Sequence, residues 1–224
     1  MGGLFLLVIV LVGFFLYRKW VLHLNENKIL KEMLTRLEAD SRIAEVFVTD
    51  VQYNPLLQKH QTTIKFLEYD SQGQSLPPKY FTFTGNIIQF QSLVVRFEDQ
   101  LVKRGDSLKG KSVYLFWKVF MLDGPRTEEY PITSVKTIPQ GYKLEGPPTQ
   151  VEKEFWKHFW DLALNKKLAQ GQGIKNAQIE APGSQFIPGV LYTLTIEHDG
   201  GIRIDTSPIP EIYRGEMILP VNPL

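Results

Sequence analysis

The first seventeen residues of the chain, Met1 to Tyr17, carry no charged side chain, and Arg18 and Lys19 follow at once. A helix over this run is apolar on every side, so it has no polar stripe to turn toward water. It reaches roughly 25 Å, a little less than the roughly 30 Å hydrocarbon core of a bilayer. Arg18 and Lys19 can close this gap by snorkelling, and Tyr17 and Trp20 match an interfacial aromatic belt. The pattern predicts a transmembrane anchor over residues 1–22, with Tyr17, Arg18, Lys19 and Trp20 at the membrane interface.

Two other interpretations of the amino-terminal run fit the residues less well. A cleaved signal peptide has a basic start and a cleavage site of small residues, whereas this run starts Met-Gly-Gly and ends in large side chains. N-myristoylation at Gly2 requires Ser or Thr where the chain has Leu6. We therefore expect the anchor to be permanent and to tie the rest of the chain to a lipid bilayer.

Basic residues flank the run on one side only, and this asymmetry bears on orientation. No Lys or Arg precedes the run, whereas Arg18, Lys19, Lys28, Lys31 and Arg36 follow it. The positive-inside rule then favours an amino terminus outside and a cytoplasmic domain. A single helix with so short an amino flank obeys the rule loosely, so the opposite orientation stays open.

Composition excludes several classes of function for the remaining two hundred residues or so. The 25 Lys and Arg almost balance the 24 Asp and Glu, and no basic block or RNA-binding aromatic motif is present, so nucleic acid is not an expected partner. The chain has no cysteine, which removes disulfides, thiol catalysis and cysteine metal sites. The length fits one large domain or two small ones.

A helical pattern follows the anchor. Ile29, Met33 and Leu37 recur at intervals of four, with charged residues between them. We expect a juxtamembrane helix over residues 23–41. Its apolar face must be covered either by its own domain or, through residues 22–39, by a protein partner or a second copy. The repeat is too short to indicate a coiled coil.

From Glu45 the apolar period changes to two, the period of a strand. Val46, Val48, Val51 and Tyr53 predict a strand with a break, such as a β-bulge, at Thr49–Asp50. In the next strand Ile64, Phe66 and Glu68 share one face. Further strands are predicted over residues 62–69, 80–84, 87–97, 111–122, 130–138, 190–197 and 202–205.

Three of the remaining segments have distinct signals. Residues 111–122 are the most apolar stretch after the anchor and predict a central strand covered on both faces, whereas Pro131 and Pro139 make residues 130–138 an edge strand. Asp199–Gly200 predicts a hairpin turn between the last two strands. A second helix is expected from Val151 to Leu168, with acidic residues in its first turn and lysines in its last.

These elements predict an α+β fold: one amino-terminal transmembrane helix, then a strand-rich, mostly antiparallel, sandwich- or barrel-like soluble domain with one or two packed helices. The domain is expected over residues 42–206. Four prolines in residues 207–224 predict an extended or poorly ordered tail.

One motif matches a phosphate-binding loop. Gly105, Gly110, Lys111 and Ser112 satisfy the spacing of Gly, four residues, then Gly-Lys-Ser. A phosphate-binding loop opens a helix, whereas the residues after Ser112 are strand-like, so no nucleotide cofactor is expected. Gly-Asp-Ser107-Leu resembles the nucleophile motif of one esterase family. The resemblance is limited to these four residues, because the chain lacks the Asp-x-x-His of that family.

Two further groups of residues are candidate sites. His198, Asp199 and Asp205 could serve acid–base or metal chemistry, but they lack a third converging group and fit a turn in which Arg203 pairs with a neighbour. No two histidines have metal-ligand spacing, so no catalytic residue or metal is expected. Trp156 and Trp160 form one row of the second helix. This row is either an interaction face for a partner or, in the packing alternative, part of the hydrophobic core.

The sequence therefore favours a non-enzymatic assembly, adaptor or binding subunit at the membrane surface. A membrane-tethered domain that encloses a lipid or another apolar ligand is the alternative. A nucleotide-binding or hydrolytic enzyme using Lys111 or Ser107 is a third hypothesis.

Overall fold

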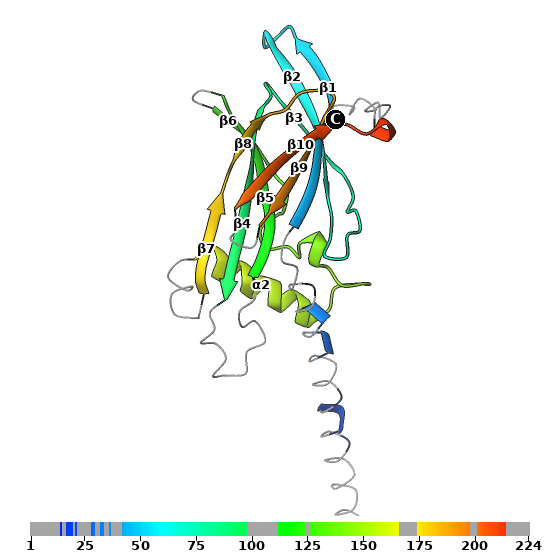
Figure 1. Cartoon of the computed structure of the whole chain (residues 1–224). Helices are drawn as coiled ribbons and strands as arrows, with labels where there is room; N and C mark the ends of the chain where they lie inside the picture. Colours follow the sequence, from blue (N-terminus) through cyan, green and yellow to red (C-terminus); the bar gives the residue numbers. More distant parts are fainter. Residues whose placement is uncertain are drawn as a thin grey trace, which may run out of the picture.

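The computed structural model describes residues 14, 17–19, 21, 28–29, 32–33, 36, 42–97, 112–123, 126–165, 174–197 and 201–213 (Figure 1). Most of the predicted anchor, including Trp20, lies outside these residues. In the described part of the chain, no helix is both long and apolar enough to cross a bilayer. The transmembrane segment over residues 1–22 therefore stays a prediction.

The strands form two antiparallel sheets. The first sheet has the order β10-β9-β1-β2-β3, and the second has the order β6-β5-β4-β7, with β8 also paired to β4. The first comprises β1 (Arg42–Asn54), β2 (Lys59–Glu68), β3 (Lys79–Phe83), β9 (Val190–Ile196) and β10 (Ile202–Pro208). The second comprises β4 (Ile87–Phe97), β5 (Ser112–Asp123), β6 (Arg126–Pro131), β7 (Ile174–Glu180) and β8 (Gly183–Gln185). The prediction of a strand-rich, mostly antiparallel domain is confirmed.

The main core lies between the two sheets and follows from the alternation of side chains. Phe66 of β2 stacks on Phe90 of β4, with ring centroids 5.7 Å apart, and meets Phe116 of β5 edge-on at 5.4 Å. All three are buried in one cluster with inward-facing residues of both sheets. Alternate residues of each strand thus face this interior.

The two sheets do not close into a barrel. Within the described ranges no backbone ladder joins them, and side chains bridge their neighbouring edges β3 and β6 instead. The Tyr130 hydroxyl donates to the Thr82 carbonyl at 2.9 Å, and a Glu128 carboxylate oxygen accepts the Thr84 backbone N–H at 2.9 Å. The sequence left a sandwich and a barrel as alternatives, and the described strands do not form a closed barrel.

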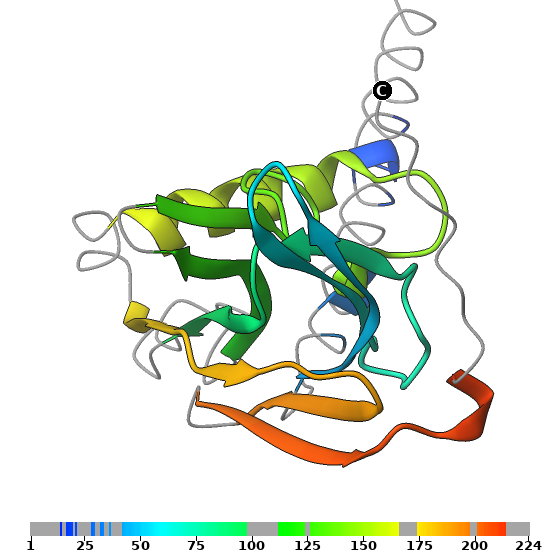
Figure 2. The same cartoon turned by 90° about the horizontal axis from the view of Figure 1, so that it is seen from above.

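A helical layer covers the outer face of the second sheet, as Figure 2 shows for α2 (Gln150–Leu164). Leu93 of β4 and Leu115 of β5 point away from the main core into a second cluster with α2. This confirms that β5 is a central strand with both faces covered. Thr149 caps α2 by accepting the Glu152 N–H at 3.2 Å.

Several element bounds differ from the prediction. Helix α2 ends at Leu164 rather than Leu168, because Asn165 has an extended backbone. The edge strand is β6, which ends at Pro131 rather than covering residues 130–138. The N–H groups of Ile132 and Thr133 both turn to the Trp117 carbonyl, at 2.8 and 3.0 Å, so the chain leaves the sheet there. β7 was not predicted, because its polar sequence has no clear alternation.

Residues 207–213 of the predicted tail lie within the described residues and pack on the domain, whereas residues 214–224 lie outside them. β10 continues to Pro208, and the 3₁₀-helix η3 (Glu211–Tyr213) follows it. Ile209 is buried with Phe47 on the outer face of the first sheet, and Tyr213 stacks on Phe47 at 5.2 Å. The domain therefore continues beyond residue 206, because these apolar side chains cover part of the outer face of β1.

Two local predictions are confirmed. The register of β1 against β2 shifts between Val48 and Asp50, which is the expected bulge. β9 and β10 form the expected hairpin, in which the Glu197 N–H bonds to the Gly201 carbonyl at 2.8 Å. The turn residues 198–200 themselves lie outside the described residues.

Candidate functional site

The residues singled out by motif do not gather into one site. Gly105, Gly110, Lys111 and Ser107 lie outside the described residues. Ser112 is the first residue of β5 and pairs with Arg96 of β4, so a strand follows it rather than the helix that a phosphate-binding loop opens.

The residues of the last hairpin hold one another on an exposed surface. His198 and Asp199 lie outside the described residues, and Asp205 accepts the Arg203 Nε–H at 2.8 Å. Arg203 also donates to Glu197 at 2.5 Å. This is the neighbour pairing that the turn interpretation expects. In the described part of the chain, no three residues of metal-ligand type lie close enough together to hold an ion.

Trp156 and Trp160 are buried in the helical layer. Their relative exposures are 2% and 1%, and both belong to the cluster between α2 and the second sheet. The Trp160 indole N–H donates to the Thr137 carbonyl at 2.7 Å. The two side chains therefore pack in the core, as the packing alternative describes, and offer no accessible face for a partner.

The described residues of the amino-terminal segment fall into two groups. Tyr17, Arg18 and Lys19 are helical and exposed, and the Arg18 guanidinium lies 6.0 Å from the Phe14 ring centroid. Further along, Met33 is 3% exposed and packs in the helical layer of the domain.

Residue 36 adds a polar contact to this docking. Arg36 donates to the Lys143 carbonyl at 2.6 Å and lies 3.9 Å from the Glu32 carboxylate. Together with partly buried Ile29, these contacts fix the described residues of this segment against the domain itself.

At the opposite end of the domain, β1 and β2 run beyond their neighbours as a two-stranded ribbon (residues 52–61), visible at the top of Figure 1. β9 pairs with β1 only as far as Phe47, and β3 pairs with β2 only from Thr62. Tyr53, Leu56 and Leu57, the apolar tip of the ribbon, are all exposed, and Leu56 reaches 92%. A ribbon of this kind leaves apolar side chains without cover from a third strand.

The turn at the apolar tip is held by one side chain. The Asn54 side-chain oxygen accepts the N–H groups of Leu56 and Leu57 at 3.0 and 3.2 Å. Its amide nitrogen donates to Gln61 across the ribbon at 3.0 Å. Asn54 therefore fixes the backbone of the two leucines in the turn.

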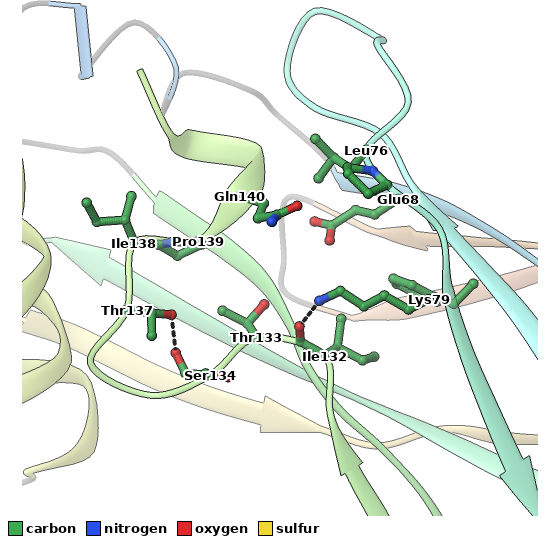
Figure 3. Close-up of a pocket in the computed structure, with 12 residues that line it drawn as sticks. Glu68, Leu76, Lys79, Ile132, Thr133, Ser134, Thr137, Ile138, Pro139 and Gln140 are labelled. Carbon is green, nitrogen blue, oxygen red and sulfur yellow. Dashed lines mark hydrogen bonds between the residues drawn. The ribbon is translucent and has the colours of Figure 1, made fainter. Parts of the chain in front are cut away.

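A pocket of about 260 Å³ lies beside the main core, between the β2–β3 side and the segment after β6 (Figure 3). Half of its lining residues are apolar: Phe66, Leu76, Pro77, Ile132, Ile138 and Pro139. The charged groups in its wall are Glu68 and Lys79. The pocket wall is thus mixed, with polar and apolar residues in equal number, and it is more polar than a typical ligand site.

Glu68 is committed to a buried partner behind the pocket wall. Its Oε1 accepts from Arg42 Nη2 at 2.5 Å, and the Arg42 side chain is 1% exposed. The Arg42 guanidinium carbon lies 4.7 Å from the ring centroid of Tyr142, and Nη1 donates to the Gly141 carbonyl at 3.4 Å. The negative charge of Glu68 therefore serves Arg42.

Among the described residues, Lys79 has no ion-pair partner of the kind that Arg42 provides for Glu68. Its ammonium donates to the Ile132 carbonyl, and none of the described carboxylates lies within 4.0 Å of it. Burial lowers the pKa of Lys79 below its ordinary value, and the charge of nearby Glu68 offsets only part of this. The pocket wall thus holds a partly desolvated cation that lacks an anionic partner.

The pocket residues were not singled out from the sequence. The available signal was the alternation that places Glu68 on the same face as Ile64 and Phe66, because an acidic residue at a core-facing position needs a buried cation. Arg42 and Lys79 have no such local pattern. Comparison of the chain with known protein families, curated proteins and solved structures finds no match.

Proposed function

We propose that the protein is a single-pass membrane protein whose strand-rich domain is a non-enzymatic adaptor or assembly subunit, and that it binds a partner protein through the apolar tip of the β1–β2 ribbon. The observation that carries the proposal is the apolar tip itself: exposed side chains on a projecting ribbon with a preformed turn. Exposed apolar patches of this kind mark interaction sites.

The place of the apolar tip favours a protein over the bilayer of the anchor. Ile29, Met33 and Arg36 dock at the α2 end of the domain, and the tip lies at the far end (Figure 1). A domain held directly at an anchor over residues 1–22 therefore presents the tip away from that membrane. The juxtamembrane segment has a second candidate role in self-association through residues 22–39, although Met33 is already covered by its own domain.

Cross-linking at the apolar tip tests the proposal in the native membrane. A photo-reactive amino acid in place of Leu56 is expected to yield discrete cross-linked protein species, identified by mass spectrometry. The matched control carries the same group at Ser71, an exposed loop position on the same sheet. A Leu57→Asp change in the Leu56 photo-probe chain is expected to reduce these species severalfold. Cross-links to lipid alone, or equal yields at both positions, would overturn the proposal.

The orientation of the domain is a separate part of the proposal, and we place it on the cytoplasmic side. The chain has no cysteine, so a single Ser71→Cys change gives a unique label site. A membrane-impermeant maleimide is expected to label this cysteine only after the cells are opened. Labelling in intact cells would place the domain outside and would leave the role of the apolar tip to the cross-linking result.

A further inference from the structure

The pocket beside Lys79 has the dimensions of a small-ligand site. Its volume of about 260 Å³ corresponds to roughly nine water-sized volumes, and it falls just below the usual range for ligand pockets. A more open groove of about 330 Å³ shares Leu76 and Gln140 with it and continues along Lys143. A ligand can therefore fill the pocket and leave it past Gln140.

The charges in the pocket wall set the sign of the ligand. Arg42 and Glu68 form a pair at 2.5 Å and cancel each other, whereas Lys79 reaches only the Ile132 carbonyl. Figure 3 shows Glu68 and Lys79 entering from the β2–β3 side and Gln140 from the opposite wall. The uncancelled charge is positive, and the remaining donors of the Lys79 ammonium are those that an anionic group would use.

The apolar part of the wall sets the rest of the ligand. Phe66 and Ile132 are buried in the main core, and the apolar lining residues that stay accessible are Leu76 and Pro77 before β3 and Ile138 after β6. A small inorganic anion would fill only the polar part and would leave this surface wet. A ligand with an apolar chain and one anionic end would do both: its chain would displace water from the apolar wall, and its anionic end would pair with the Lys79 ammonium.

We propose that this pocket binds a small amphipathic carboxylate, whose carboxylate group pairs with the Lys79 ammonium while its apolar chain lies against Leu76, Pro77 and Ile138. The same chemistry has two sources: a free medium-chain fatty acid, and the carboxyl-terminal residue of a peptide with an apolar side chain. The inference does not rest on the proposed role of the apolar tip, which lies at the far end of the ribbon.

Calorimetric titration of the full-length protein in detergent tests the site with defined probes. Octanoate, with about ten non-hydrogen atoms, matches the pocket volume, and octanol and octylamine are its neutral and cationic counterparts. Octanoate is expected to bind at least about tenfold more tightly than either, because a charge-assisted hydrogen bond is made only by the carboxylate. Acetyl-leucine, with acetyl-leucine amide as its control, distinguishes the peptide source from the fatty-acid source. Equal binding of octanoate and octanol, or tighter binding of octylamine, would refute the assignment.

Variants locate the binding in this pocket. Lys79→Met is expected to weaken octanoate binding about tenfold or more while leaving octanol binding unchanged. Gln140→Trp, at an exposed position of the 3₁₀-helix η2 (Gln140–Tyr142), is expected to block the mouth and weaken both, and it keeps the test decisive if Lys79→Met does not fold. Lys118→Met is the matched control: Lys118 lies on β5 and pairs with Glu129 of β6, and this variant is expected to bind as the parent chain does. Leu57→Asp at the apolar tip is likewise expected to have no effect, so the two proposals fail separately. Unchanged octanoate binding in both pocket variants would overturn the proposal.

Discussion

Two arginines at the same end of the first sheet make the same contact in opposite surroundings. Arg42 and Arg203 each place a guanidinium nitrogen 2.5 Å from a glutamate carboxylate, Glu68 and Glu197 respectively. Arg42 lies beside Ile196 in the sheet, whereas Arg203 lies beside Thr195, one residue away. Because side chains alternate, this step of one residue puts Arg42 on the inner face and Arg203 on the outer face. Their side-chain exposures are 1% and 57%.

The comparison shows that the distance within an ion pair does not determine how much the pair contributes to the stability of the fold. Solvent screens Arg203, and long exposed side chains lose entropy when they pair, so the contact adds little to stability. Arg42 has already lost its hydration, so the fold depends on Glu68 to compensate the buried charge. The inner pair is therefore needed once Arg42 is buried, and the outer pair is dispensable.

The largest expected effect comes from removing the inner partner. Glu68→Gln leaves the Arg42 guanidinium buried without a carboxylate, and we expect it to lower the free energy of unfolding by about 3–5 kcal/mol. For a domain of this size the melting temperature should fall by roughly 2–4 °C per kcal/mol. Thermal unfolding of the full-length protein in detergent, followed by tryptophan fluorescence, measures the change.

Glu197→Gln is the matched control on the outer face. It removes the carboxylate from Arg203 at the same 2.5 Å distance and should leave the melting temperature unchanged. Equal losses in the two variants would show that contact distance, and not burial, decides the worth of the pair.

A smaller effect is expected from crowding Arg42 rather than removing its partner. A Cβ added at Gly141 would lie 1.7 Å from Arg42 Nη2, and this guanidinium is held by Glu68, so it cannot simply swing aside. We expect Gly141→Ala to lower the free energy of unfolding by about 1–3 kcal/mol.

A double-mutant cycle with Arg42→Met decides whether that loss comes from the contact. The penalty of Gly141→Ala should shrink by at least about half in the Arg42→Met chain, because the clashing atoms are gone. Additive losses would place the origin of the penalty elsewhere, for instance in the backbone of η2.

The parts of the fold that follow from short-range pattern were predictable. Short-range patterns identified seven of the ten strands that the described residues form, at nearly their observed positions, and the break at Thr49–Asp50 appeared as the register shift in β1. Residues 111–122 are apolar without alternation, which predicted a strand covered on both faces. The structure confirms this, because side chains of β5 lie in both core clusters. Each of these signals lies within about a dozen neighbouring residues.

The inner arginine pair and the pocket could not be predicted in this way. Arg42 and Glu68 are 26 residues apart and meet only because β1 pairs with β2. Lys79 faces a carbonyl, at Ile132, that becomes available only where the chain leaves the sheet after Pro131. These contacts depend on register and on strand ends, which are the features that propensity specifies least well.

The end of the domain was misjudged for a related reason. The four prolines in residues 207–224 predicted an extended or poorly ordered tail. In the structure Ile209 is buried, and Tyr213 stacks on Phe47. Their partners belong to β1 and β9, far away in the chain. An apolar residue between prolines carries no information about a distant face that it will cover.

The smallest expected effect concerns a pair of intermediate burial on the outer face. The Tyr69 hydroxyl donates to Glu45 at 2.7 Å, and burial together with this bond raises the pKa of the Tyr69 phenol above its ordinary value of 10.0. The folded chain then keeps a proton that the unfolded chain loses, so stability is full below about pH 10 and falls as the pH rises past it. Tyr69→Phe should make this fall shallower between about pH 9 and 11 in urea unfolding, whereas exposed Tyr80→Phe should not. An unchanged slope in Tyr69→Phe would mean that this partly covered contact behaves like the exposed Arg203 pair.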